Sequence, residues 1–171
     1  MKKMKRLVAV LLAGVLALAM LTACGSTPDA PVVRDEALEK DVAQWTVELG
    51  KDYRMDLTVD ETMTAISLTC MPYLVKGYDA SRVQDYPAVK KALAEWNAAL
   101  AKAANGKKVI TLNVAFNDGL EINKKALAEY VHANEDAYRA QLKEAGITKL
   151  TKFGVTVTKQ KGYKLISIIV A

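Results

Sequence analysis

One histidine and two nearby carboxylates are the residues of this chain best suited to proton transfer. His132 is the single histidine among 171 residues, Glu129 precedes it by three positions, and Asp136 follows it by four. On a helix these spacings bring the three side chains to one face. A histidine oriented by a carboxylate there would act as a general base. A catalytic zinc site usually has three protein ligands, often with more than one histidine, so we predict no metal.

Other catalytic patterns are absent from the sequence. It contains no glycine-rich phosphate loop, no G-x-S-x-G and no H-E-x-x-H. His132 also lies one position away from the apolar stripe formed by Leu127, Val131 and Tyr138, so we expect its side chain to be exposed. The sequence therefore favours a protein that is not an enzyme, and it predicts no cofactor.

Three tyrosines are grouped around a segment whose composition interrupts regular structure. Tyr73, Tyr78 and Tyr86 fall within or beside residues 71–84, which include Pro72 and Gly77. Loops often carry function, and tyrosine supplies contact area at a small cost in side-chain entropy. We take the three tyrosines as a candidate binding surface. The alternative is that their rings pack down onto the sheet edge or the helix ends.

The two cysteines have different surroundings. Cys70 lies on the apolar side of a predicted strand without a group that would activate it, so we expect a buried, inert thiol. Cys24 follows a basic start and the uncharged apolar run 7–21, and it closes the tetrapeptide Leu21-Thr22-Ala23-Cys24. Small residues directly before a cysteine, after such a run, are typical of a processing site.

This N-terminal arrangement resembles the signal peptide and lipobox of bacterial lipoprotein precursors. The resemblance implies cleavage before Cys24 and a diacylglyceryl group on its sulfur. Residues 7–21 are shorter than the roughly 20 apolar residues of a bilayer span, which favours a cleaved signal over the alternative, an uncleaved anchor. Two acyl chains hold a protein stably on a bilayer, whereas one chain holds it marginally. Acylation of Cys24 would also leave Cys70 without a disulfide partner.

The resemblance divides the chain into three parts. Residues 1–23 are the predicted signal peptide, and residues 24–33 are the predicted acylated cysteine with a flexible tether of small residues and prolines. Residues 34–171 are long enough to form one domain with a sizeable core. The implied location is the outer face of the bacterial cytoplasmic membrane or, in a Gram-negative cell, the outer membrane.

The net charge of the chain is concentrated at its start. The sequence has 24 Lys and Arg and 19 Asp and Glu, and four of the cations belong to the predicted signal peptide. The remaining 20 cations nearly balance the anions, which argues against nucleic acid as a partner. Residues 107–171 still carry 11 cations and 6 anions. That half is suited to anionic lipid head groups or wall polymers, unless its charges only form a solvated surface.

Hydrophobic periodicity predicts eight elements in the order αββαβαββ. Each helix has terminal signals: Gly50 follows the first, Pro87 opens the second, and Asn123 caps the third. The predicted helices cover 35–50, 87–104 and 124–145, and the predicted strands cover 53–59, 63–70, 107–116, 149–159 and 163–170. A helix over 61–71 is the alternative to the second strand.

These elements predict an α+β fold. Four of the five strands have one apolar face, so we expect about three helices on one side of a mostly antiparallel sheet. Residues 165–170 are apolar on both faces, which predicts a central strand.

Together the patterns predict a membrane-anchored envelope lipoprotein with a non-catalytic binding or accessory domain. Its expected partners are the lipid bilayer, through Cys24, and an envelope protein, a wall polymer or a small ligand. The alternative is a small cell-envelope enzyme that uses His132 with a nearby carboxylate.

Overall fold

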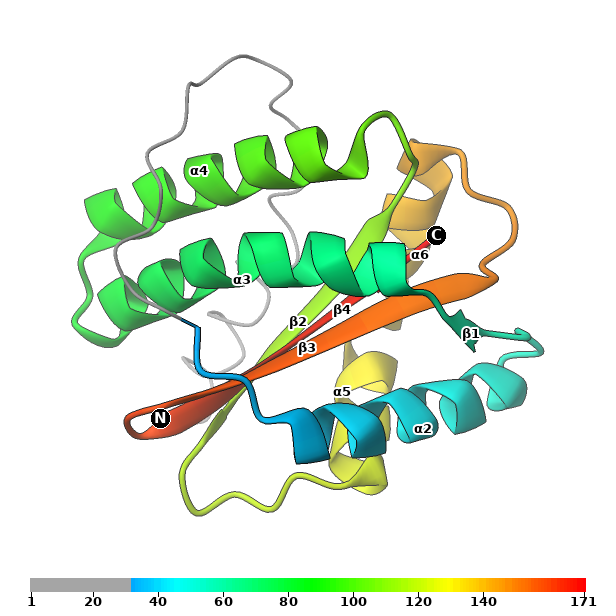
Figure 1. The fold of residues 1–171 in the computed structure, drawn as a ribbon, viewed down its shortest axis with the longest axis horizontal. Coiled ribbons are helices and arrows are strands. Elements are labelled where there is room, and N and C mark those ends of the chain that lie inside the picture. The colour runs from blue at the N-terminus through cyan, green and yellow to red at the C-terminus, as the bar shows by residue number, and fades with distance from the viewer. Residues whose placement is uncertain (1–31) are drawn as a thin grey trace.

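The computed structural model describes residues 32–171, so the predicted signal peptide, Cys24 and most of the predicted tether lie outside the described residues. Figure 1 shows the arrangement of the elements in space. In chain order they are α2 (Glu36–Asp52), β1 (Thr58–Val59), α3 (Glu61–Arg82), α4 (Tyr86–Ala104), β2 (Ile110–Asn117), α5 (Lys124–Ala133), α6 (Glu135–Ala145), β3 (Lys152–Gln160) and β4 (Tyr163–Val170). None of the helices in this range is both long and apolar enough to span a membrane.

The strands form one mixed sheet with the order β1-β3-β4-β2. β4 pairs antiparallel with both β3 and β2, whereas the short β1 runs parallel to β3. The predicted α+β class and the central position of 165–170 are confirmed. The sheet of the described residues has four strands, so the prediction of about five was too high.

Helices cover both faces of the sheet, which corrects the prediction of helices on one side (Figure 1). α2, α5 and α6 pack on the face that carries Phe153, Val155 and Val157 of β3. α3 and α4 pack on the opposite face, which carries Leu165 and Ile169 of β4. β2 and β3 present mainly small or polar residues on that second face. In a sequence, such residues usually indicate a strand face that is exposed to solvent, so the second layer of helices was not predicted.

The segment after β1 is the largest departure from the prediction. Residues 61–82 form the single helix α3, not a strand over 63–70 followed by an irregular segment. The first strand, predicted over 53–59, is reduced to Thr58–Val59. The Asp60 carboxylate accepts a hydrogen bond from Met63 N at 3.1 Å, which caps the start of α3. The buried stripe of α3 consists of Met63, Ile66, Ser67, Cys70, Met71, Leu74, Val75, Gly77 and Tyr78.

Two predicted turns into and out of helices are confirmed. α4 begins beside Pro87, and the Asp85 carboxylate accepts from Ala88 N at 3.0 Å. α4 ends at Asn105, whose left-handed backbone (φ +48°) suits an asparagine. The predicted hairpin at the C-terminus is also present as β3 and β4.

The predicted helix over 124–145 is two helices with a break at Asn134. Asn123 caps α5 as predicted, since its side-chain oxygen accepts from Ala126 N at 2.9 Å. At the other end, Asn134 Nδ2 donates to the Tyr130 carbonyl at 2.8 Å. This carbonyl is one of the last of α5, which have no donor within the helix. α6 then starts with the acidic residue Glu135, which the helix dipole favours.

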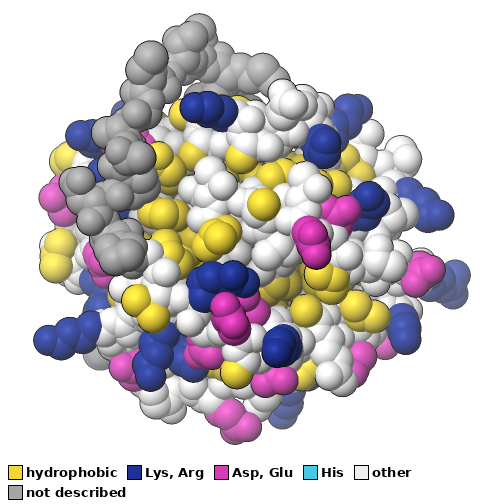
Figure 2. Space-filling view, in the orientation of Figure 1, with side chains coloured by type: hydrophobic (Ala, Val, Ile, Leu, Met, Phe, Trp, Pro, Cys, Tyr) yellow, Lys and Arg dark blue, Asp and Glu magenta, His cyan; other side chains and the backbone are white. Residues whose placement is uncertain are grey.

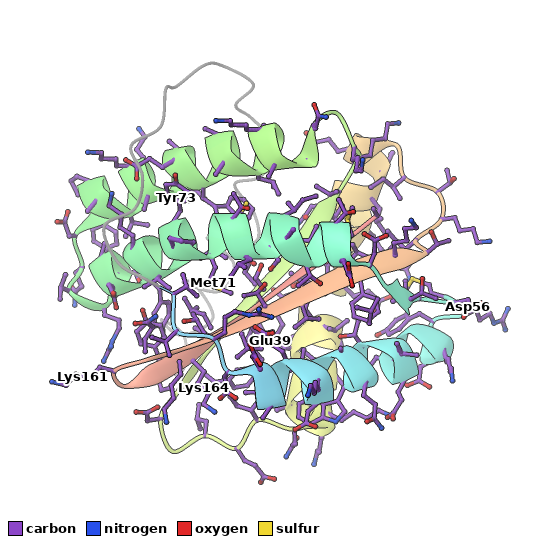
Figure 3. All side chains as sticks on the ribbon, viewed as in Figure 1. Glu39, Asp56, Met71, Tyr73, Lys161 and Lys164 are labelled. Atoms are coloured by element: carbon purple, nitrogen blue, oxygen red, sulfur yellow. The ribbon has the colours of Figure 1, made fainter. Side chains whose placement is uncertain are left out.

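The segment that enters the domain completes the free edge of β3. Lys159 N donates to the Val33 carbonyl at 3.1 Å. Glu39 extends from the first turn of α2 toward β3 (Figure 3), where its carboxylate accepts from Val157 N at 2.9 Å. The last residues of the predicted tether 24–33 therefore pack against the sheet.

Candidate functional site

The structure does not bring the predicted proton-transfer residues together. The His132 side chain is 81% exposed, and its Nδ1 lies 3.5 Å from the Glu135 carboxylate. Glu129 lies 4.0 Å from Lys125 Nζ, and Asp136 belongs to the separate helix α6. Within residues 32–171 no three His, Cys, Asp or Glu side chains are grouped to hold a metal ion. The exposure of His132 agrees with the sequence prediction, and the carboxylate that lies beside it is that of Glu135.

The three predicted binding tyrosines do not share a loop. Tyr78 is buried, and its hydroxyl donates to the Asn117 side-chain oxygen at 3.1 Å. Tyr73 lies on α3 (Figure 3), half-buried against the core on that side of the sheet. Tyr86 is 66% exposed at the start of α4. The predicted irregular segment was wrong, and Tyr78 and Tyr73 follow the alternative in which the rings pack down.

Cys70 is a fully buried residue of α3. Burial raises the pKa of its thiol to about 12, so the thiol stays protonated near neutral pH. The predicted burial is confirmed, although the residue is on a helix and not on a strand.

The charged side chains do not form a large patch of one sign on the face shown in Figure 2. Cations and anions alternate over that face, and several are paired. Lys152 Nζ lies 3.0 Å from Asp60, and Lys164 Nζ lies 2.7 Å from Asp35. For these residues the alternative of an ordinary solvated surface fits the structure better than a basic binding face.

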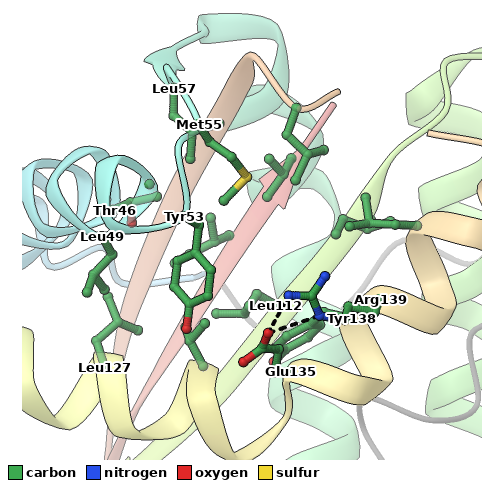
Figure 4. A pocket seen from close by; sticks show the side chains of 17 residues that line it. Thr46, Leu49, Tyr53, Met55, Leu57, Leu112, Leu127, Glu135, Tyr138 and Arg139 are labelled. Atoms are coloured by element: carbon green, nitrogen blue, oxygen red, sulfur yellow. Dashed lines mark hydrogen bonds and ion pairs between the residues drawn. The ribbon is translucent and has the colours of Figure 1, made fainter. Parts of the chain in front are cut away.

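A pocket of about 240 Å³ is the most distinctive feature of the α2, α5 and α6 side (Figure 4). Its floor is the end of the sheet where β2 begins and β4 ends, and its walls are the three helices and the chain between α2 and β1. Its apolar lining consists of Leu49, Gly50, Met55, Leu57, Ile110, Leu112, Leu127, Val131, Leu142, Leu150, Ile168 and Val170. These residues come from seven separate parts of the chain.

The turn after α2 shapes one wall of the pocket. The Met55 amide donates to the Gly50 carbonyl at 2.8 Å, and Arg54 takes a left-handed backbone with φ +59°. A Cβ on Gly50 would lie 2.9 Å from Leu57 Cδ1 and 3.3 Å from the Met55 carbonyl oxygen, so glycine lets this chain pack on α2 without a shift of the Leu57 side chain. The turn places Tyr53 so that its ring extends toward α5 (Figure 4).

The opposite wall depends on the break between α5 and α6. Val131, Glu135, Tyr138 and Leu142 all line the pocket, at the spacing of one helical face. The helix is interrupted at Asn134, and residues of both short helices, α5 and α6, border the cavity.

Two of the lining residues are charged, and they form an ion pair. Arg139 donates from Nε and Nη2 to one oxygen of Glu135, at 2.9 and 2.6 Å (Figure 4). The guanidinium lowers the pKa of the Glu135 carboxyl, and His132 contributes a weaker Coulomb attraction. The Arg139 side chain is 69% exposed and that of Glu135 is 29% exposed, so solvent screens the pair.

Tyr138 places a second polar group in the same wall. It is 7% exposed, and its hydroxyl interacts with that of the neighbouring Tyr130. The Tyr130 hydroxyl in turn donates to the Asn113 carbonyl at 2.7 Å. Burial raises the pKa of Tyr138, so its hydroxyl remains a hydrogen-bond donor at any physiological pH.

Comparison of the chain with protein families, with curated proteins and with solved structures gave no match. The candidate site therefore rests on its own geometry. That geometry is an apolar cavity with few polar groups, the usual form of a small-molecule site.

The sequence analysis did not find this site. Asn134 followed by Glu135 and Asp136 is a helix-start pattern, and it signalled the break that shapes the pocket. The lining itself had no local pattern, because neighbouring positions in space are far apart along the chain.

Proposed function

We propose that the protein is a membrane-anchored envelope lipoprotein whose domain binds an apolar ligand without catalysis. The pocket beneath α5 and α6 carries this proposal. Its volume of about 240 Å³ exceeds the roughly 150 Å³ of an engineered protein cavity that binds benzene. The N-terminal pattern that ends at Cys24 supports the anchor.

The lining favours binding over chemistry. Most of it is aliphatic, and its two charged residues, Glu135 and Arg139, contact each other. The Thr46 hydroxyl donates to the Val42 carbonyl at 2.7 Å and so has no proton left for a ligand. Each methylene group of a ligand that leaves water for this cavity contributes about 0.8 kcal/mol to binding.

The tether and the pocket are at different ends of the sheet. The entering chain bonds to Lys159 near the end of β3, whereas the pocket is lined by Leu150 before β3 and by Val170 at the end of β4. Because β3 and β4 are antiparallel, those lining residues lie at the end opposite Lys159 (Figure 1). An anchored domain of this kind keeps its pocket away from the point of attachment.

Photolabelling of the full chain in phospholipid nanodiscs tests the pocket. A ten-carbon alcohol with an aliphatic diazirine is expected to label peptides of α2, α5 and β4 by mass spectrometry. Val131→Trp is expected to reduce this labelling about tenfold, since its indole takes the space of at least two ligand methylenes.

Val89→Trp is the matched control. Val89 is half-buried like Val131 but lies on α4, across the sheet from the pocket. Its labelling should equal that of the wild type. Equal labelling of Val131→Trp and the wild type, or labelling mainly of α3 and α4, would contradict the proposed site.

A further inference from the structure

The charges at the pocket are not equivalent. Glu135 has two nitrogen-bearing neighbours, Arg139 at 2.6 Å and His132 at 3.5 Å. Arg139 contacts Glu135 through Nε and one Nη2 hydrogen. A guanidinium carries five N–H donors in a planar fork, so Arg139 keeps donors for another anion.

Other positive groups lie on the same side. Lys108 Nζ is 3.5 Å from the Gly146 carbonyl at the end of α6. Lys143 follows Arg139 by one turn of α6 and is exposed. The anions of this helix are Glu135 and Asp136 in its first turn and Glu144 near its end. Lys108, Arg139 and Lys143 are thus matched in number by the three anions of α6.

Most of the pocket lining is aliphatic, and three of its polar residues, Glu135, Tyr138 and Arg139, come from α6. Thr46 and Tyr53 add polar groups on the α2 side. Arg139 retains N–H donors that its contact with Glu135 does not use. A ligand that fills the aliphatic region and reaches Arg139 must have an apolar body and a group that accepts hydrogen bonds.

We infer that the pocket binds a single-chain amphiphile whose anionic head group, a carboxylate or a phosphate, lies at Arg139. The chain fills the aliphatic region above Ile168 and Leu112, and the head group displaces part of the contact between Arg139 and Glu135. Glu135 then keeps His132 as a neighbour. This inference rests on the proposed function of the pocket and adds the charge of its ligand.

The test compares ligands that share a ten-carbon chain and differ in charge: decanoate, decyl phosphate, decanol and decyltrimethylammonium. The full chain is kept in phosphatidylcholine nanodiscs, equilibrium dialysis fixes the free ligand concentration, and methyl shifts give the dissociation constants. We expect decanoate or decyl phosphate to bind about fivefold tighter than decanol, the effect of one partly exposed charge pair. The tighter of the two identifies the head group as carboxylate or phosphate.

Two substitutions should move the constants in opposite directions. Arg139→Gln is expected to bring the anionic ligands to the level of decanol or weaker. Glu135→Gln removes the competing carboxylate and is expected to tighten the anionic ligands further, with decanol unchanged. Lys90→Gln, an exposed cation on α4 across the sheet, is the control and should change none of the constants.

The outcomes separate this inference from the proposed function. If decanol binds as tightly as both anionic ligands, or if Arg139→Gln leaves their ratio unchanged, the anionic head group is wrong and the apolar pocket stands. If none of the ten-carbon compounds shifts the pocket methyls, both the inference and the proposed function are wrong.

Discussion

The substitution Cys24→Ala is expected to abolish palmitate labelling of the protein completely. The proposed lipid is attached to the sulfur of Cys24, and alanine offers no atom for it. The substituted protein also lacks the two acyl chains that would hold it stably on the bilayer. The measurement is metabolic labelling of cells that express the wild-type or the substituted chain, followed by isolation of the protein.

Cys70→Ala is the matched control for this experiment. Cys70 is the other cysteine of the chain, and it is fully buried on α3. Its replacement should leave palmitate labelling at the wild-type level. If the wild type and Cys24→Ala are labelled equally, the lipid is not on Cys24, and the proposed anchor has to be abandoned.

Gly154→Ala is expected to destabilise the domain by about 3 kcal/mol or more, and Gly154→Val to prevent folding. A Cβ at this position of β3 would lie 2.0 Å from Thr64 N and 2.2 Å from the carbonyl carbon of Met63. Both are backbone atoms of the first turn of α3, so the helix must move away from the sheet. Overpacking of this kind costs about 1–3 kcal/mol even where side chains can adjust. Domains have free energies of unfolding of only about 5–15 kcal/mol, and we expect the destabilisation by Gly154→Val to exceed that of this domain.

Gly77→Ala provides the control on the same helix. Its Cβ would meet Ala92 at 3.4 Å, an ordinary contact, and alanine favours a helix over glycine by about 1 kcal/mol. Urea unfolding should therefore show a lower midpoint for Gly154→Ala and an equal or higher one for Gly77→Ala. A Gly154→Ala domain as stable as the wild type would mean that α3 does not approach β3 as described.

The elements that the sequence predicted well have their signals close together. α4 has a proline at its start and an asparagine at its end, and the β3–β4 hairpin has an alternating first strand, a turn at Lys161-Gly162 and a continuous apolar second strand. In these cases the local preference and the tertiary packing agree, which is the usual basis of a reliable prediction.

The start of α3 was predicted only as the alternative, a helix over 61–71, because local and tertiary preferences conflict there. Thr64, Ile66 and Thr69 are β-branched and favour a strand, and Pro72 suggested an interruption. The helix nevertheless buries Ile66, Cys70 and Leu74 on one face, a spacing of four residues. Burial against β3 and β4 outweighs the local preference, as tertiary context often does.

The covered second face of the sheet escaped prediction for a related reason. Gly154, Thr156 and Ser167 are small or polar, and in a sequence such residues indicate a face toward solvent. In the structure they let α3 come close, and Ser67 of α3 donates to the Ser167 carbonyl at 3.2 Å. These residues lie on the face beneath α3 because they are small, although their polarity suggests exposure to solvent.

The most direct test of the binding proposal is a methyl nuclear magnetic resonance titration of the full chain in nanodiscs with decanol. The proposal predicts saturable shifts at the methyls of Leu49, Leu112 and Val131, which line the pocket. It predicts no shifts at Leu74 and Val75, which lie in the core across the sheet. Shifts confined to the second group, or no saturable shift at any pocket methyl, would contradict it.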